Sequence, residues 1–363
     1  MKRIVVSGYY GFGNVGDEAV LAGTLASFRS LNADVEITVL SGDPADTTAV
    51  HGVASLPRYS LSAVTQAIRQ SDLLLSGGGS LLQDVSSARS AAYYFGVIAL
   101  AELLRVPVML YAQGVGPITR TVTALQARLL LNRVALASVR DADSADLLRR
   151  LGVKRPPIHV TADPSFALDP ATEEETDRLL AEADIPAGSA LLGVAVRQWN
   201  AGENWPKAVA KGVDEAARLT GATPVFIPMH YPADVEIAEQ LAGELSVRSG
   251  RLRTRLTPTQ AKGVVGRMDV LLGMRLHALM FAAAQGTPSV ALSYDPKVTS
   301  FATGAPGHMP VINVGSATSE EIAESLERVW ANRAAIGSAL SSAQPYWRAE
   351  AIRNSALALE LLK

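Results

Sequence analysis

The residues best suited to chemistry lie in the second half of the chain, around a glycine that ends a predicted strand. Arg275 and His277 follow Gly273 and open an apolar predicted helix, and Lys297 follows the next predicted strand. A helix start offers free amide N–H groups and the positive end of the helix dipole. Together with guanidinium, imidazole and ammonium groups, it favours a site for a small dianion. The alternative is that the histidine is an ordinary core residue.

A second candidate is the glycine-rich loop between the first predicted strand and helix. Its segment 11–16, Gly-Phe-Gly-Asn-Val-Gly, has the G-x-G-x-x-G spacing of dinucleotide-binding proteins. Asp17 and Glu18 place negative charge where a pyrophosphate would lie, so a nicotinamide dehydrogenase is disfavoured. Asp17 can instead accept a proton from a sugar hydroxyl, with Asn14 as a neighbouring hydrogen-bonding group. The alternative is a tight turn followed by helix-capping acids.

Two further loops follow predicted strands in the first half. Gly77, Gly78 and Gly79 form a triplet whose N–H groups can bind an anion or a hydroxyl, or can simply allow a close turn. Arg140 suits a carboxylate or a phosphate unless it pairs with a nearby aspartate. Ligands bind at the carboxyl ends of strands in open parallel sheets, so both loops are expected at the site.

Arg197 and His230 follow strands of the second half in the same way, and we treat them as weaker candidates that can also be structural. No group of His, Asp and Glu residues shows the spacing typical of a metal site. The sequence therefore predicts neither a metal nor a cofactor.

Composition narrows the class of protein. The 363 residues include 33 Lys and Arg against 35 Asp and Glu, for a net charge of −2, which disfavours a nucleic-acid-coating role. The chain has no cysteine, which excludes disulfides, thiolate zinc sites and cysteine nucleophiles. No apolar run reaches the ~20 residues that span a bilayer, and no secretory signal is recognisable, so we expect a cytoplasmic protein. The arginines at 248–255 are interpreted as a solvated surface, with contact to lipid phosphates as the alternative.

Short apolar runs alternate with longer amphipathic segments, which predicts an α/β fold of parallel sheets covered by helices. A segment rich in proline, followed by an acidic run, suggests domains at residues 1–168 and 169–342 that face a cleft. A final helix at 343–363 is expected to pack back on the first domain. The main predicted strands are Ile4–Ser7, Glu36–Leu40, Asp72–Ser76, Pro107–Ala112, Ala135–Val139, Leu191–Val196, Pro224–Ile227, Asp269–Leu272, Ser289–Leu292 and Val311–Val314.

These motifs together resemble those of the polysaccharide pyruvyl transferases. The segments that carry the resemblance are Gly8–Glu18, Ser76–Asp84, Gln113–Pro117, Ser138–Asp141 and Gly273–His277. The likeness is greatest to the bacterial cell-wall enzymes that pyruvylate the polymer anchoring S-layer proteins. It implies two Rossmann-like domains similar to the B-type glycosyltransferases, phosphoenolpyruvate as donor, and a sugar like N-acetylmannosamine in a lipid-linked precursor as acceptor. Peripheral contact with the inner face of the membrane would follow.

The resemblance also assigns roles to residues. It implies donor binding by Arg275, Leu276 and His277, and by Arg140 and Lys297. In the reaction that these roles imply, His277 acts as the acid or stabilises the departing phosphate. A sugar hydroxyl deprotonated by Asp17 attacks phosphoenolpyruvate. Two other hypotheses remain open: a B-type glycosyltransferase that uses a nucleotide sugar, and a non-catalytic sugar-binding protein.

Overall fold

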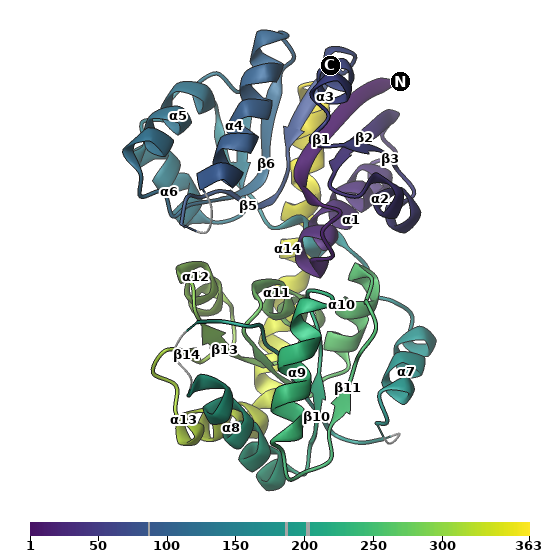
Figure 1. Cartoon of the computed structure of the whole chain (residues 1–363), viewed down its shortest axis with the longest axis vertical. Helices are drawn as coiled ribbons and strands as arrows, with labels where there is room; N and C mark the ends of the chain where they lie inside the picture. The colour runs from purple at the N-terminus through teal and green to yellow at the C-terminus, as the bar shows by residue number, and fades with distance from the viewer. Residues whose placement is uncertain (86–87, 186–187, 201–203) are drawn as a thin grey trace. The chain divides into compact units, whose positions relative to one another are not determined.

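The computed structural model describes residues 1–85, 88–185, 188–200 and 204–363. The chain forms two compact units (Figure 1). The first unit comprises Met1–Phe12, Asp17–Leu168 and Tyr346–Lys363, and the second comprises Gly13–Gly16 and Asp169–Pro345. A short piece of the N-terminal glycine-rich loop therefore belongs to the second unit.

The first unit is built on a parallel sheet with strand order β3-β2-β1-β4-β6-β7-β8, and β5 pairs with β6 beside this path. Its strands are β1 (Lys2–Tyr10), β2 (Val35–Ser41), β3 (Ala54–Pro57), β4 (Leu73–Ser76), β5 (Gly79–Leu82), β6 (Val108–Val115), β7 (Leu136–Val139) and β8 (Ile158–Val160). Its helices are α1 (Val15–Ser30), α2 (Pro44–His51), α3 (Leu61–Arg69), α4 (Ala88–Leu103), α5 (Thr121–Leu131) and α6 (Ala142–Arg150), and a 3-10 helix spans Pro164–Ala167.

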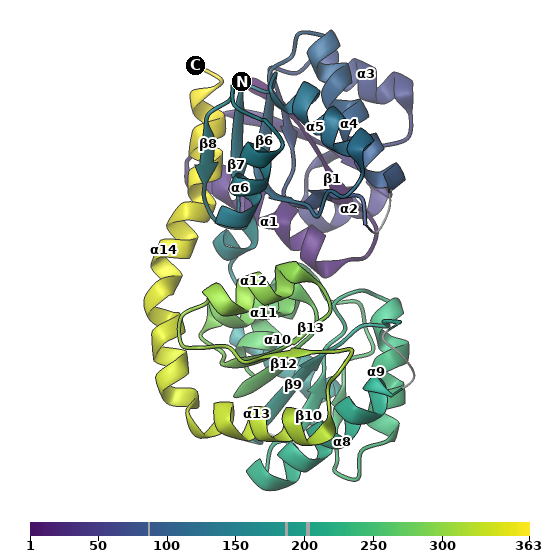
Figure 2. The same ribbon diagram turned by 90° about the vertical axis from the view of Figure 1, so that its left-hand side faces the viewer.

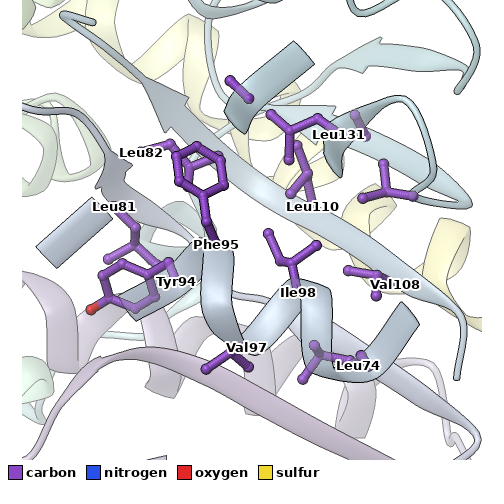
Figure 3. Close-up of a cluster of buried hydrophobic side chains, with 14 of the residues drawn as sticks. Leu74, Leu81, Leu82, Tyr94, Phe95, Val97, Ile98, Val108, Leu110 and Leu131 are labelled. Atoms are coloured by element: carbon purple, nitrogen blue, oxygen red, sulfur yellow. The ribbon is translucent and has the colours of Figure 1, made fainter. Parts of the chain in front are cut away.

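Successive side chains of these strands serve opposite faces of the sheet, as the pleat requires. Val5 belongs to the core beneath α3, α4, α5 and α6, whereas Ile4 and Val6 belong to the core beneath α1 and the C-terminal helix. Figure 3 shows the first of these cores, where Ile98 of α4 points toward Leu110 of β6. Because both faces are covered, the strands read as continuous apolar runs in the sequence.

The second unit has a parallel sheet of order β11-β10-β9-β12-β13-β14. Its strands are β9 (Leu191–Ala195), β10 (Thr223–Phe226), β11 (Gly250–Arg251), β12 (Val270–Gly273), β13 (Ser289–Ser293) and β14 (Val311–Asn313). Its helices are α7 (Glu173–Glu182), α8 (Trp205–Thr220), α9 (Ala233–Gly243), α10 (Pro258–Gly266), α11 (Leu276–Gln285), α12 (Pro296–Gly304), α13 (Ser319–Ala331) and the first part of α14 (Arg333–Glu360). Helices α8 and α13 lie side by side and share a core with β9 and β12 (Figure 2).

Helix α14 begins ten residues before the predicted start at 343, and its second half belongs to the first unit. There the Ser355 hydroxyl lies 2.7 Å from the Tyr111 hydroxyl, and the Asn354 amide donates to the Ala162 carbonyl at 3.0 Å. No helix in the described part of the chain combines the length and apolar character that crossing a membrane requires. The predicted α/β class with two parallel sheets is confirmed.

Candidate active site

Each sheet reverses its strand order at one place, between β1 and β4 in the first unit and between β9 and β12 in the second. At such a switch point the loops leave adjacent strands in opposite directions, which leaves room for a ligand at the carboxyl ends. Asp17, in the first turn of α1, follows β1, and Gly77–Gly79 follow β4. Arg197 and Arg275 follow β9 and β12 in the same way. The predicted residues therefore follow the strands where a ligand is expected.

In the first unit the Asp17 carboxylate lies against the glycine triplet. A Cβ on Gly79 would stand 3.1 Å from Asp17 Oδ1, and the φ angle of Gly79 is +91°. A side chain at this position would be strained and would crowd the carboxylate. Two motifs that are about 60 residues apart in sequence thus meet at one edge of the sheet.

Two buried polar side chains border the same loop. Among the described residues, neither the Tyr10 hydroxyl, which lies against Gly77, nor Gln113 Oε1 has a hydrogen-bond partner. The Gln113 amide nitrogen donates to the Gly79 carbonyl at 2.7 Å. Burial, and then the Asp17 carboxylate, raise the pKa of Tyr10 well above its ordinary value, so its hydroxyl stays protonated. Buried donors and acceptors are normally paired, so these two groups make the interior beside the loop unusually polar.

Arg140 is buried beside this loop, with a side chain only 4% exposed. Its Nη1 donates to Asp163 Oδ2 at 3.1 Å and its Nη2 donates to the Ser80 hydroxyl at 2.9 Å. A Cβ on Gly114 would stand 2.8 Å from the guanidinium, so glycine is needed for the arginine to pass. The expected alternative partner, Asp141, lies farther away, with Oδ2 3.5 Å from Nε. Arg140 is therefore held at the end of the glycine triplet by a different aspartate.

Glu18 stabilises the glycine-rich loop. Its Oε1 accepts from the Gly11 amide at 2.8 Å, and its Oε2 lies 2.8 Å from Nε2 of the buried His51. The φ angle of Gly11 is +77°, a conformation that favours glycine. For Glu18 the structure supports the structural alternative, in which the acid secures the turn.

A buried arginine supports the same loop from the other side. Arg58 donates to the Gly8 carbonyl at 2.8 Å and to the Tyr94 hydroxyl at 3.2 Å. Its guanidinium carbon lies 4.2 Å from the centre of the Tyr93 ring and 5.3 Å from that of Phe12. Cation–π contacts of a desolvated arginine are stabilising, so this cluster fixes the strand end from which the loop to Asp17 departs.

In the second unit, the start of α11 is open to an anion. Its N-cap is Arg275, which makes no side-chain cap, and its first turn carries no acid. The next helix, α12, is instead capped by Asp295, which accepts from the Lys297 amide at 3.0 Å. The first amides of α11, those of Leu276 and His277, lack intrahelical acceptors. A dianion is therefore better accommodated at α11 than at α12.

A buried aspartate orients Arg275. Asp234 accepts from Nε of Arg275 at 2.9 Å and also from its Nη2, in a bidentate pair. The same carboxylate accepts from the Met229 amide at 3.1 Å, and Asp234 is 1% exposed. The guanidinium is thus fixed in orientation, and its Nη1 lies outside the pair.

His277 lies against the glycine-rich loop within the second unit. A Cβ on Gly16 would collide with the imidazole at Nδ1. Gly16 does not have a positive φ angle, so it is this close approach that requires glycine. The ring of Phe281, one helical turn further along α11, lies 6.5 Å from the imidazole ring. The position of the histidine ring therefore depends on residue 16.

The same short segment pairs with the loop that follows β10. Asn14 forms an isolated antiparallel bridge with His230, and the Val15 amide donates to the Met229 carbonyl at 2.9 Å. The side-chain oxygen of Asn14 accepts from the Gly16 amide at 3.1 Å. Asn14 and His230, both predicted as site residues, are thus brought together with Gly16.

Arg197 lies among aromatic rings after β9. Its guanidinium carbon is 5.2 Å from the centre of the Tyr294 ring and 5.6 Å from that of Trp199, and its Nη1 donates to the Tyr294 hydroxyl at 3.3 Å. Tyr294 directly precedes the N-cap of α12, on whose first turn Lys297 lies. Arg197 and Lys297 therefore belong to the same edge of the second sheet.

The predicted residues are thus divided between the two units. Asp17, the glycine triplet and Arg140 come together in the first. The second holds Asn14, Arg197, His230, Arg275, Leu276, His277 and Lys297. The expected donor-binding residues are therefore divided, with Arg140 in the first unit and the others in the second. Within the described residues, no three His, Asp or Glu side chains are grouped as metal ligands.

Comparison with known proteins gives the family. The model of the polysaccharide pyruvyl transferases matches residues 14–296, a range that includes Asp17, the glycine triplet, Arg140, Arg275 and His277 and ends just before Lys297. The chain belongs to this family. It is accordingly a transferase enzyme that acts on polysaccharides. No curated protein sequence matches the chain.

Solved structures similar to this pyruvyl transferase show its fold. One is a Listeria monocytogenes protein assigned as a UDP-N-acetylglucosamine 2-epimerase, 13% identical with a TM-score of 0.69, covering 99% of this chain and 96% of that one. Another is Anabaena Alr3699/HepE in complex with UDP and glucose, 14% identical with a TM-score of 0.66, covering 99% and 100%. At such identity the likeness concerns the fold alone, which is that of the B-type glycosyltransferases.

The sequence analysis does not predict several residues that contact the candidate site residues. Asp234 and Asp163 hold the two arginines, and Tyr10 and Gln113 place polar atoms beside Asp17. The need for the two aspartates can be predicted, because an arginine expected inside the protein needs a buried carboxylate partner. Tyr10 and Gln113 lie in the motif segments Gly8–Glu18 and Gln113–Pro117, but nothing in the sequence indicates their buried polar atoms that are unpaired among the described residues.

The Asp234–Arg275 pair makes a testable contribution to stability. We expect Asp234→Asn to lower the free energy of unfolding by about 3–5 kcal/mol, because it leaves the buried guanidinium without its counter-charge. Urea unfolding followed by tryptophan fluorescence measures this, since Trp199, Trp205 and Trp330 all lie in the second unit. Asp295→Asn is the control: it keeps the cap of α12 and weakens only a half-exposed pair, at a cost below about 1 kcal/mol. Equal effects of the two substitutions would contradict the assignment.

Proposed function

We propose that this enzyme transfers pyruvate from phosphoenolpyruvate to a sugar of a cell-wall polysaccharide precursor, forming a 4,6-linked ketal and releasing phosphate. The observation that carries the proposal is the start of α11, where an uncapped helix end meets Arg275 and His277. Phosphoenolpyruvate is small and carries both a carboxylate and a phosphate, which matches this concentration of positive charge. Family membership supports the reaction class.

For the donor, we assign the phosphate to the first amides of α11 and to His277, with Nη1 of Arg275 as a further donor. Lys297 adds an ammonium group from the neighbouring helix start, where its Nζ lies 3.5 Å from Asp295 Oδ2 in a loose, partly exposed pair. Arg140 is assigned to the donor through the family resemblance. Its buried network with Asp163 and Ser80 leaves it fixed rather than mobile.

The chemistry balances without an outside reagent. A proton is added to the methylene carbon of phosphoenolpyruvate, which makes the adjacent carbon electrophilic. A sugar hydroxyl, deprotonated by Asp17, forms a C–O bond to that carbon, the bond to phosphate breaks, and a second hydroxyl closes the ketal. Of the two hydroxyl protons released, one is matched by the proton on the new methyl group and the other by the proton on phosphate. His277 supplies the acid or stabilises the departing phosphate.

For the acceptor, we propose an N-acetylmannosamine-like sugar of a lipid-linked precursor, made on the cytoplasmic side of the membrane. The first unit offers two groups to bind sugar hydroxyls, the Asp17 carboxylate and the glycine triplet. Asn14, His230 and Arg197 are the candidates for acceptor contacts in the second unit.

Ligand-induced thermal stabilisation separates this function from its competitors. We expect phosphoenolpyruvate to raise the melting temperature and nucleoside diphosphates to leave it unchanged, because a bound ligand stabilises the folded state. Lys297→Gln should weaken phosphoenolpyruvate binding about tenfold, whereas the exposed Lys211→Gln should not change it. Incubation with phosphoenolpyruvate and a lipid-linked disaccharide analogue should release phosphate in step with pyruvylation of the sugar.

Two results would overturn the proposal. Stabilisation by UDP without any effect of phosphoenolpyruvate would favour a glycosyltransferase that uses a nucleotide sugar. Stabilisation by the saccharide alone, with no phosphate released, would favour a non-catalytic sugar-binding protein.

A further inference from the structure

The outer face of α5 carries an apolar stripe that nothing in the structure covers among the described residues. Val122, Leu125 and Leu129 are 69%, 54% and 54% exposed, and their spacing places them on one face of the helix. Leu103, at the end of the neighbouring helix α4, is 79% exposed. Soluble surfaces seldom align large apolar side chains in this way unless they meet a partner.

The stripe is surrounded by positive charge. Residues 103–160 contain nine Lys and Arg but three Asp and Glu, in a chain whose net charge is −2. Eight of the nine cations are exposed, and only Arg140 is buried. We call the apolar stripe with Leu103 and these cations the α5 surface; the cations are Arg105, Arg120, Arg128, Arg133, Arg149, Arg150, Lys154 and Arg155.

Contacts among loops bring three of these cations to the C-terminal end of α5. Asn132 Oδ1 accepts from the amides of Lys154 and Arg155 at 2.9 and 3.0 Å. Arg133 Nη1 lies 3.5 Å from Glu102 Oε2, which ties the end of α5 to the end of α4. Figure 1 shows α4, α5 and α6 on the same side of the first sheet. The stripe on α5 and the cations Arg133, Lys154 and Arg155 therefore lie on neighbouring parts of the first unit.

Most of this charge is not neutralised within the protein. Arg133 and Arg149 have carboxylate partners, whereas the structure shows no ion pair for the other six cations with any described residue. The basic stretch at 248–255 differs, because Glu239 pairs with both Arg251 and Arg253 there. The α5 surface is thus the stronger of the two candidates for an anionic partner.

We propose that the α5 surface docks the enzyme on an anionic phospholipid bilayer. Apolar side chains flanked by arginine and lysine match the boundary between acyl chains and negatively charged headgroups. A second copy of the chain fits less well, because a two-fold interface would place basic residues against basic residues. A nucleic acid would match the charges but would leave the aliphatic stripe without a partner. The inference names a surface for the membrane contact that the proposed lipid-linked acceptor implies, and its test requires neither donor nor acceptor.

Vesicle sedimentation of the full chain tests this proposal. We expect binding to vesicles of phosphatidylcholine with phosphatidylglycerol, little binding to phosphatidylcholine alone, and weaker binding at high salt. The variant Val122→Ser/Leu125→Ser/Leu129→Ser and the variant Arg120→Gln/Arg128→Gln/Lys154→Gln/Arg155→Gln should each reduce partitioning at least about tenfold. All seven side chains are exposed, so both variants should keep the melting temperature of the parent protein.

A matched variant and a second measurement make the outcomes decisive. Leu61→Ser/Leu219→Ser removes two exposed leucines outside the α5 surface and should bind vesicles like the parent protein. The proposal would be overturned if the serine substitutions on α5 left vesicle binding unchanged, or if the protein bound neutral and anionic vesicles equally. So would a concentration-dependent dimer in analytical ultracentrifugation that the same serine substitutions abolish.

Discussion

Replacing Asp17 with asparagine should lower kcat by about 10²–10⁴-fold, the range typical of a lost general base. Asparagine keeps the shape of the side chain and can still accept a hydrogen bond, but it cannot take the proton of an attacking hydroxyl. The carboxylate lies beside Gly79, and its field contributes to the raised pKa of Tyr10. Phosphoenolpyruvate should still raise the melting temperature of Asp17→Asn, because the assigned donor contacts are made by other residues.

A nearby aspartate provides the control for this experiment. Asp43 caps α2 at the same edge of the first sheet, where its side chain accepts from the Asp46 amide at 3.1 Å. Asparagine caps helices as well as aspartate does, so Asp43→Asn should leave both stability and turnover unchanged. If steady-state phosphate release by Asp17→Asn stays within about threefold of the parent enzyme, Asp17 is not the base.

The main elements of the fold could be predicted from the sequence, because buried parallel strands and amphipathic helices have distinct patterns. Three short strands could not. Strands β3, β5 and β11 span only two to four residues, and β5 lies inside the glycine motif, where no apolar run signals a strand. Their pairing is decided by tertiary contacts rather than by local preference. The transfer of Gly13–Gly16 to the second unit depends on contacts with residues more than 200 positions away.

For the site, the sequence identified the reactive side chains but not the residues that hold them. Arg275 was predicted as an anion ligand, and nothing local shows that Asp234, 41 residues earlier, forms a bidentate pair with it. For Arg140, an ion pair with Asp141 or Asp143 is the alternative that the sequence offers; the structure shows the pair with Asp141, at 3.5 Å, and a shorter one with the distant Asp163, at 3.1 Å. Loop composition indicates where a ligand binds, but long-range folding determines which carboxylate reaches each guanidinium.

The glycine motif illustrates the same limit. Its spacing suggested a dinucleotide turn, in which the third glycine allows close packing of helix and strand. Here Gly16 allows a close approach of a different kind, by the ring of His277. Glycine is therefore required at position 16 by the position of the His277 ring, and a substitution there is expected to lower turnover.

Gly16→Ala should reduce turnover about 100-fold or more, because the added methyl group displaces the His277 ring, and a shift of about 1 Å at a reacting group has effects of this size. The double variant Gly16→Ala/His277→Ala should be no slower than His277→Ala alone, since residue 16 acts through the imidazole. Gly243→Ala, which places a methyl group in open space on α9, should leave kcat unchanged. Equal losses from Gly16→Ala in the parent and in the His277→Ala background would show that Gly16 acts independently of the histidine. A melting temperature close to that of the parent enzyme would confirm that the single variant is folded when its turnover is measured.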